Sequence, residues 1–412
     1  MSLRVSARPN KGLVVRFNPA EVRISPYKLS VLCSGSGLFL AAMVATLAIG
    51  FREPLLDYLY ECLVLALAAG WCLAPWAKAP PLVPALSLGA ILAWGLFQLG
   101  TGATVYPYAT LEGSLRFAAL AGTAWISYRA FELAKMRDVF LQVLAWFGAI
   151  VAIVSVLAYS TSPGMILWTF DAPYPDVWGP FLSRNNFAQF LELAMPAALW
   201  MALSKPAGRL LYLCLTAVML ASGLASASRA GSAILILEAI IVLWMARKSP
   251  WARAMGLGLV LATILFAAIP GVGNLRGRLT APDPYQGRRE IAQATLEMIS
   301  NRPWTGFGLG TFPVVYPAYA VFDFGQSVDH AHNDWLEWTA EGGIAFAAVW
   351  IALALWSARR VVGAGWGIGV LGCFLHGVVD YPFARFGVSA WVFILIGMLA
   401  ASEVREVRHG RH

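Results

Sequence analysis

The chain has 412 residues, of which 59% are hydrophobic and only 13% are charged, and its formal net charge is +8. A water-soluble domain carries roughly 25% charged residues, so this composition excludes a soluble globular protein and predicts a polytopic membrane protein. The positive charge does not indicate nucleic-acid binding, because the basic residues gather beside the expected membrane spans.

Apolar stretches long enough to cross a bilayer recur along the chain. They begin near Leu29, Leu55, Leu82, Ser114, Val139, Phe187, Arg209, Ala230, Arg253, Gly343, Val362 and Gly387. The expected fold is therefore all-α, with about 12 transmembrane helices, the first nine in residues 29–270 and the last three in residues 343–404. We expect residues 1–28 and 405–412 to be cytoplasmic tails; the first is basic and lacks the apolar core of a cleaved signal peptide.

The distribution of basic residues predicts the orientation. With the N-terminus inside, about 20 of the 30 Lys and Arg residues fall on the cytoplasmic side, as the positive-inside rule requires. About nine fall on the outer side, and all of them are Arg. Arg can bind phosphate or carboxylate through two parallel hydrogen bonds, which Lys cannot do. The outer arginines therefore predict an anionic ligand on the outer face.

Two loops on the outer side are long, residues 161–186 and residues 271–342. We expect the second to be partly helical, because it contains the stretch GRREIAQATLEMI. A loop of this length is uncommon without a function. It places Arg288 next to Arg289, and neighbours on a helix point to different faces, so either could face a ligand.

Two further arginines lie at expected helix starts. FLSRNNFAQF places Arg184 beside Asn185 and Asn186 at the outer mouth of a helix, with Ser183 or Asn185 as the N-cap. The free N–H groups of a helix start favour an anion. ASASRAGSA places Arg229 in a short outer turn among small residues, and an Arg near membrane depth is a functional candidate. The alternatives are an ordinary cap at Arg184 and a contact with lipid headgroups at Arg229.

The motif HAHNDWLEWTAEGG precedes the tenth expected span. If it is helical throughout, the eleven residues from His332 to Gly343 make close to three turns, so both lie on one face. His332 is then the candidate acid or base, and Asn333 or Asp334 could orient a substrate or cap the helix. The alternatives are a structural role for His332 or His330, and a metal site at His330, His332 and Asp334, which lacks a further well-spaced ligand.

FLHGVVDYPF places His376 and Asp380 one helical turn apart, near the outer end of the penultimate span. An Asp within a membrane is costly and usually has a partner. We therefore expect these two side chains to pair inside the bundle, and a structural role is favoured over a chemical one.

Together these segments resemble the superfamily of bacterial O-antigen ligases, O-antigen polymerases and protein O-oligosaccharyltransferases. In chain order they are FLSRNNFAQFLELAMP, SASRAGS, GRREIAQATLEMISNRPWTGFGLGTF, HAHNDWLEWTAEGG and HGVVDYPF. His332 and Asn333, followed after nine residues by Gly343, match the His-Asn motif at the end of the family's long periplasmic loop. The resemblance runs from about Gly179 to the C-terminus. GRRE has two arginines and HAHND has two histidines, so the resemblance alone does not assign each role to one residue of the pair.

The resemblance implies a membrane-embedded glycosyltransferase of the C type in the bacterial inner membrane, with its site facing the periplasm. It implies transfer of a glycan from undecaprenyl pyrophosphate to an acceptor hydroxyl, which in a ligase belongs to lipid A–core, without metal or other cofactor. His332 would be the base, and arginines would stabilise the charge on the leaving pyrophosphate. The residues expected to bind pyrophosphate or glycan are Arg184, Asn186, Arg229, Arg288, Arg289 and Asn333. Further candidates near them are His330, Asp334, His376 and Asp380.

A ligase and a polymerase differ in the acceptor and would use the same residues; the single long loop late in the chain favours a ligase. A protein O-oligosaccharyltransferase is a third possibility. A polysaccharide-lipid transporter would show inverted repeats or charges at mid-membrane, whereas here the polar residues gather on the outer face. A membrane metallohydrolase is the remaining alternative, and loss of activity on chelation would distinguish it.

Overall fold

The computed structural model describes residues 25–409 apart from 51–53, 74–79, 173–176, 268–285, 322–324 and 326. Most of the described chain is helical, and one two-stranded antiparallel sheet joins β1 (Met165–Ile166) to β2 (Phe170–Asp171). Most of the expected N-terminal tail, the last three residues, and residues 271–285 of the expected long outer loop lie outside the described residues.

The helices follow the apolar stretches of the sequence, and each expected stretch contains one of them. In chain order the helices are α1 (Pro26–Ala48), α2 (Pro54–Cys72), α3 (Leu82–Thr101), α4 (Pro107–Ala130), α5 (Ala134–Thr161), α6 (Arg184–Ser204), α7 (Arg209–Ala225), α8 (Arg229–Met245), α9 (Pro250–Ala267), α11 (Gln286–Asn301), α12 (Phe312–Val315), α13 (Asp334–Val361), α14 (Ile368–His376) and α15 (Phe386–His409). Short 3₁₀ turns are η2 (Tyr316–Ala318), η3 (Gly365–Gly367) and η4 (Pro382–Ala384).

Seven of the described helices are long and apolar enough to cross a membrane, namely α1, α2, α3, α5, α6, α13 and α15. Shorter apolar helices span Arg209–Ala225, Pro250–Ile264 and Gly365–His376. The protein is therefore a multi-pass, all-α membrane protein in its described part, while the count of about 12 spans and the cytoplasmic termini stay predictions. The penultimate stretch is shorter than expected, because its helix ends at His376.

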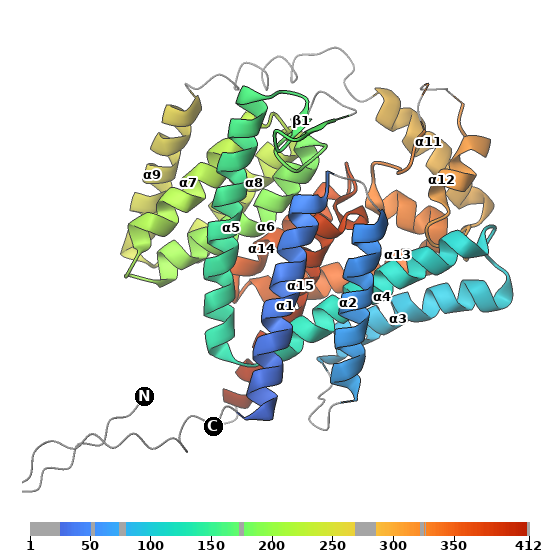
Figure 1. The fold of residues 1–412 in the computed structure, drawn as a ribbon, viewed down its shortest axis with the longest axis horizontal. Coiled ribbons are helices and arrows are strands. Elements are labelled where there is room, and N and C mark those ends of the chain that lie inside the picture. The colour runs from blue at the N-terminus through green and yellow to red at the C-terminus, as the bar shows by residue number, and fades with distance from the viewer. Residues whose placement is uncertain are drawn as a thin grey trace, which may run out of the picture.

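Helices α6 and α15 form the centre of the bundle, as Figure 1 shows. Helix α15 packs against α4 and α1, and α6 packs against α5, α7, α8 and α14. In the same view the start of α1 and the end of α15 lie on one side of the molecule, and α11 and α12 lie on the opposite side. This arrangement is what two termini on one face of a membrane, with the long loop on the other, would produce.

Helix α13 is interrupted at Gly343, where φ is 79° and ψ is 176°. The segment after α11 binds the backbone groups around the interruption: Phe307 N–H donates to Ala340 O (3.0 Å), and Ile344 N–H donates to Pro303 O (2.8 Å). A Cβ at Gly343 would lie 2.3 Å from the carbonyl oxygen of Trp304. Only glycine fits both this backbone conformation and this close approach.

The expectation that His332 and Gly343 share one helical face is therefore wrong. The helix begins only at Asp334, and it is broken at Gly343. Gly343 does permit a close approach, as expected, but the segment that approaches it is the Pro303–Trp304 turn and not another helix. The interruption divides α13 into an outer half, Asp334–Gly342, and a longer half that continues into the bundle.

The outer half of α13 packs with α11 and α12 around a second hydrophobic core. Its buried members are Ile291, Ala294, Met298, Phe307, Phe312, Val315, Tyr316, Ala331 and Ala340. The stretch GRREIAQATLEMI lies within α11, so the helix predicted there is confirmed. This small unit carries Arg288, His330 and His332, and its packing fixes their positions relative to the bundle.

Candidate active site

His332 lies two residues before the start of α13, in a left-handed backbone conformation with φ at 51°. Non-glycine residues rarely adopt this conformation, and where they do it often marks a functional position. Asn333 is the N-cap, and its side-chain oxygen accepts a hydrogen bond from Leu336 N–H (3.0 Å). Capping fixes the chain direction at His332, whose side chain is 35% exposed and so remains accessible.

Asp380 is the partner of His332. The Nδ1 atom of His332 lies 3.2 Å from Oδ1 of Asp380, and the Asp380 side chain is only 3% exposed. Burial raises the pKa of Asp380, but the hydrogen bond from His332 and the charge of Arg288 outweigh burial and leave the pKa below its usual value. Asp380 is therefore ionised near neutral pH and can only accept, so Nδ1 of His332 is the donor, and in the neutral imidazole the lone pair is on Nε2.

Arg288 completes this arrangement from α11. One guanidinium nitrogen lies 3.9 Å from Oδ2 of Asp380, and the other donates to the carbonyl oxygen of Val379 (2.7 Å). Arg289 lies on a more exposed part of α11. The structure thus brings Arg288, rather than its neighbour, to the carboxylate that holds His332, and it joins three segments that are distant in the sequence.

His330 faces a different carboxylate. Its Nδ1 atom lies 2.9 Å from Oε1 of Glu337, whose other oxygen accepts from Ala331 N–H (2.7 Å). The ring of Tyr381 stacks on His330 with centroids 4.5 Å apart, and it meets the ring of His332 edge-on at 5.0 Å. Tyr381 therefore contacts both histidine rings, and the sequence marked it only as the neighbour of Asp380.

These contacts do not form a metal site. His330 turns to Glu337, His332 turns to Asp380, and the carboxylate of Asp334 accepts from Phe383 N–H (3.2 Å). Among the described residues, no three His, Cys, Asp or Glu side chains are grouped so that they could hold a metal ion. The alternative that places a metal at these two histidines and Asp334 is therefore not supported.

The expected pairing of His376 with Asp380 is wrong. Helix α14 ends at His376, and Asp380 N–H donates to the His376 carbonyl oxygen in the turn that follows (3.0 Å). His376 instead approaches Glu192 of α6, with Nδ1 2.7 Å from Oε1, and both side chains are fully buried. This pair joins α14 to the centre of the bundle.

Arg184 and Arg229 are the first residues of α6 and α8. Ser183 caps α6 through Asn185 N–H (3.2 Å), which confirms one of the two expected N-caps. Ser228 caps α8, and its hydroxyl also donates to the side-chain oxygen of Asn185 (2.8 Å), so the two helix starts lie side by side. Both helices pack against α14, the helix that leads to Asp380.

Asn186 differs from these arginines because its side chain points inward. It is 6% exposed and donates to Gln189 on the same helix (2.9 Å). The structure therefore places Asn186 inside the bundle, whereas the arginines at the helix starts are partly exposed.

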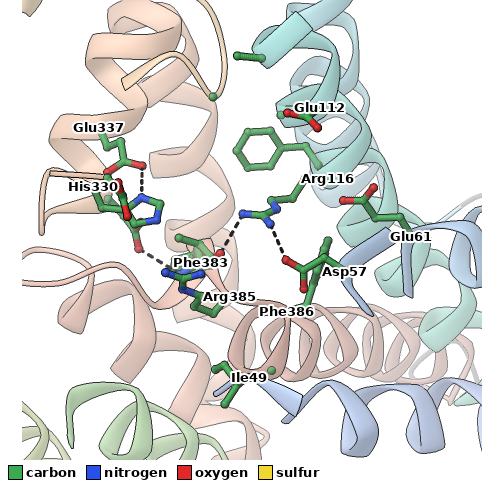
Figure 2. A pocket seen from close by; sticks show the side chains of 18 of the residues that line it. Ile49, Asp57, Glu61, Glu112, Arg116, His330, Glu337, Phe383, Arg385 and Phe386 are labelled. Carbon is green, nitrogen blue, oxygen red and sulfur yellow. Dashed lines mark hydrogen bonds and ion pairs between the residues drawn. The ribbon is translucent and has the colours of Figure 1, made fainter. Parts of the chain in front are cut away.

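A cavity of about 380 Å³ adjoins His330, and Figure 2 shows it. Its walls come from α1, α2, α4, the outer half of α13, and residues 383–387. On α13, Asp334, Glu337, Trp338 and Glu341 follow helical spacing and share the face that lines it. Sequence reasoning named Asp334 but missed Glu337, Trp338, Glu341, Glu61 and Glu112; the available signal was acidic side chains within otherwise apolar helices.

Comparison with known proteins gives one family. A family model described as O-antigen ligase matches residues 214–351, and no curated protein matches the chain. The matched region includes α8, α11, α12 and the outer half of α13. It contains Arg229, Arg288 and His332, and it ends before Asp380.

Proposed function

Residues 214–351 match the O-antigen ligase family model, and from that premise we propose that this protein is an O-antigen ligase. It transfers a glycan from undecaprenyl pyrophosphate to a hydroxyl of lipid A–core on the periplasmic face of the inner membrane. The observation that carries the proposal is the contact of His332 with Asp380 and of Asp380 with Arg288. A base, the group that orients it and a cation for an anionic leaving group are thus within one cluster.

His332 acts as the base through Nε2. The acceptor oxygen attacks the anomeric carbon of the donor sugar, its proton passes to Nε2, and the bond from that carbon to the pyrophosphate oxygen breaks. Asp380 holds the ring through Nδ1 and stabilises the imidazolium that forms. Because the carboxylate is buried, it stays fixed and does not reorganise during the reaction.

Arg288 binds the pyrophosphate as it leaves. The guanidinium group has five N–H donors, and Asp380 and Val379 engage only part of them. Arg184 and Arg229, at adjacent helix starts, add positive charge where the anion would otherwise lack a counter-charge. Asn333 positions His332 by capping α13, and Arg289 remains the alternative to Arg288.

The function is tested with purified protein, a lipid-pyrophosphate-linked glycan and lipid A–core, with EDTA present. We expect wild type and His330→Ala to form glycan-bearing lipid A–core, His330→Ala at a lower rate, and His332→Ala to form almost none. Transfer only to a second donor glycan would make the protein a polymerase, and transfer lost on chelation would contradict the metal-free mechanism. Undiminished transfer by His332→Ala would remove His332 as the base.

A further inference from the structure

The cavity beside His330 has an acidic lining. Its carboxyl-bearing residues outnumber its arginines by seven to two: Asp57, Glu61, Glu112, Asp329, Asp334, Glu337 and Glu341 against Arg116 and Arg385. We call it the acidic cavity. Its volume of about 380 Å³ lies in the range of small-molecule sites, and Phe117, Trp338, Phe383 and Phe386 supply apolar walls.

Arg116 does not make the acidic cavity an anion site. One of its terminal nitrogens lies 3.1 Å from Oδ2 of Asp57, the other donates to Ala384 O (3.0 Å), and the group lies over the Phe386 ring at 5.1 Å. Figure 2 shows it held between these partners. Its charge is thus balanced within the wall, and a phosphate in the cavity would face an excess of carboxyl groups.

Most carboxyl groups of the lining already have donors. The pairs are Asp57 with Arg116, Glu112 with Tyr58, Asp334 with Phe383 N–H, Glu337 with His330, and Glu341 with Phe312 N–H. Glu61 is different: it is 8% exposed, and it has no hydrogen bond or ion pair within the described part of the chain. In Figure 2 its carboxyl group points into the cavity.

A buried carboxyl group without a donor is costly, so Glu61 marks a place where a ligand or water supplies one. Sugar hydroxyls and ammonium groups donate hydrogen bonds, whereas phosphate and carboxylate groups only accept them. Apolar walls with an acceptor such as Glu61 therefore suit an uncharged sugar or an amino sugar. They do not suit the pyrophosphate of the donor.

The position of the acidic cavity relative to His332 matches this chemistry. His330 and Glu337 form part of its wall, and the Tyr381 ring contacts both His330 and His332. Arg288 and Asp380 are not among its lining residues. Arg288, which we propose binds the donor, is therefore not part of the acidic cavity, although both lie next to the segment that holds His330 and His332.

We propose that the acidic cavity binds the sugar unit of the acceptor next to the reacting hydroxyl, that Glu61 accepts hydrogen bonds from it, and that the cavity selects neutral or amino sugars over anionic ones. This proposal rests on the proposed glycan transfer. It holds equally for lipid A–core and for a second donor glycan, because either acceptor would present a sugar without negative charge at this position.

Saturation-transfer NMR on the purified full-length protein, without donor, tests binding directly. The probes are methyl glucoside, methyl glucosaminide and methyl glucuronide, and the proteins are wild type, Glu61→Gln and Glu297→Gln. Glu297→Gln makes the same charge change on the exposed face of α11. We expect wild type and Glu297→Gln to bind the first two probes at least about tenfold more tightly than the glucuronide. In Glu61→Gln, binding of the glucosaminide should weaken about tenfold, and the difference in affinity between the glucosaminide and the glucuronide should shrink.

A transfer assay then separates the two proposals. Glu61→Gln should raise the KM for the acceptor severalfold, with kcat and the KM for the donor close to wild type. Equal binding of the glucuronide by wild type, or unchanged glucosaminide binding and acceptor KM in Glu61→Gln, would overturn the assignment of the acidic cavity. Selective binding without any transfer by wild type would support a sugar site while contradicting the glycan-transfer function.

Discussion

Asp380 contacts His332 through one carboxylate oxygen and Arg288 through the other, at 3.2 Å and 3.9 Å. One buried group therefore orients the candidate base and holds the cation that we propose binds the leaving group. The sequence alone does not indicate this relationship, because the three residues lie far apart along the chain. They come from α11, from the segment before α13 and from the segment after α14.

Replacing Asp380 by Asn should lower kcat far more than it changes either KM. The amide keeps the shape but no longer stabilises the imidazolium or fixes the tautomer, and we expect a loss of about 10²–10⁴-fold. Initial rates in the reconstituted transfer assay measure it. Asp171→Asn, on the exposed strand β2, makes the same chemical change and should leave the rate unaltered. An Asp380→Asn enzyme within twofold of wild type would remove Asp380 from the mechanism.

Arg288→Lys should reduce kcat more than Arg289→Lys does. A lysine retains the charge but cannot contact Val379, Asp380 and a phosphate group together, so the expected loss at Arg288 is about 10–10²-fold. Parallel kinetics on the two variants decide between the neighbours. A larger loss at Arg289 would transfer the pyrophosphate role to that residue.

The stability that Asp380 contributes should depend on pH in one direction. Its pKa in the folded protein lies below the value of about 3.9 for an exposed Asp, because the hydrogen bond from His332 and the charge of Arg288 outweigh the opposite effect of burial. The contribution is therefore complete above that value and disappears as the pH falls through the folded pKa. The difference in Tm between wild type and Asp380→Asn should be largest near neutral pH and shrink below about pH 4. A difference that grows on acidification would contradict the ion pair.

Gly343→Ala should destabilise the protein by about 1–3 kcal/mol or more, because alanine is strained at a φ of 79° and its Cβ would meet the Trp304 carbonyl oxygen. Gly70→Ala is a suitable control, since nothing lies within 4 Å of a Cβ there and the residue is within α2. That change should be neutral or slightly stabilising. Thermal unfolding of both variants in the same detergent measures the difference, and equal Tm values would argue against strain at Gly343.

The places of the helices could be predicted from the sequence because they depend on local hydropathy. Each apolar stretch contains a helix, and the helix in GRREIAQATLEMI is present as α11. The break of α13 at Gly343 could not be predicted, because glycine alone does not break a helix. The break depends on the Pro303–Trp304 turn, which lies forty residues earlier and contacts α13 only in the folded chain.

The candidate site was predictable in its residue types and less so in its pairings. His332 and Arg288 were among the expected residues, but the choice between Arg288 and Arg289 depends on Asp380, whose position no periodicity indicates. His376 and Asp380 have helical spacing, yet α14 ends between them and His376 turns to Glu192. Glu61 was missed because a single acid in an apolar helix carries no motif; only the packing of α2 against α4 shows that it faces a cavity.

The interruption of α13 at Gly343 also has a mechanical consequence. The outer half of α13 is bound to the segment after α11 through Phe307, and Asp334 N–H donates to the carbonyl oxygens of Gly377 and Asp380. The cation, the base and the acid that orients it are therefore joined by hydrogen bonds into one body, which is attached to the bundle at Gly343, through Gln98 of α3 and through α14. If the longer half tilts to match a thinner or thicker bilayer, the distances within that body are preserved. We expect transfer rates to be nearly the same in short-chain and long-chain lipid vesicles.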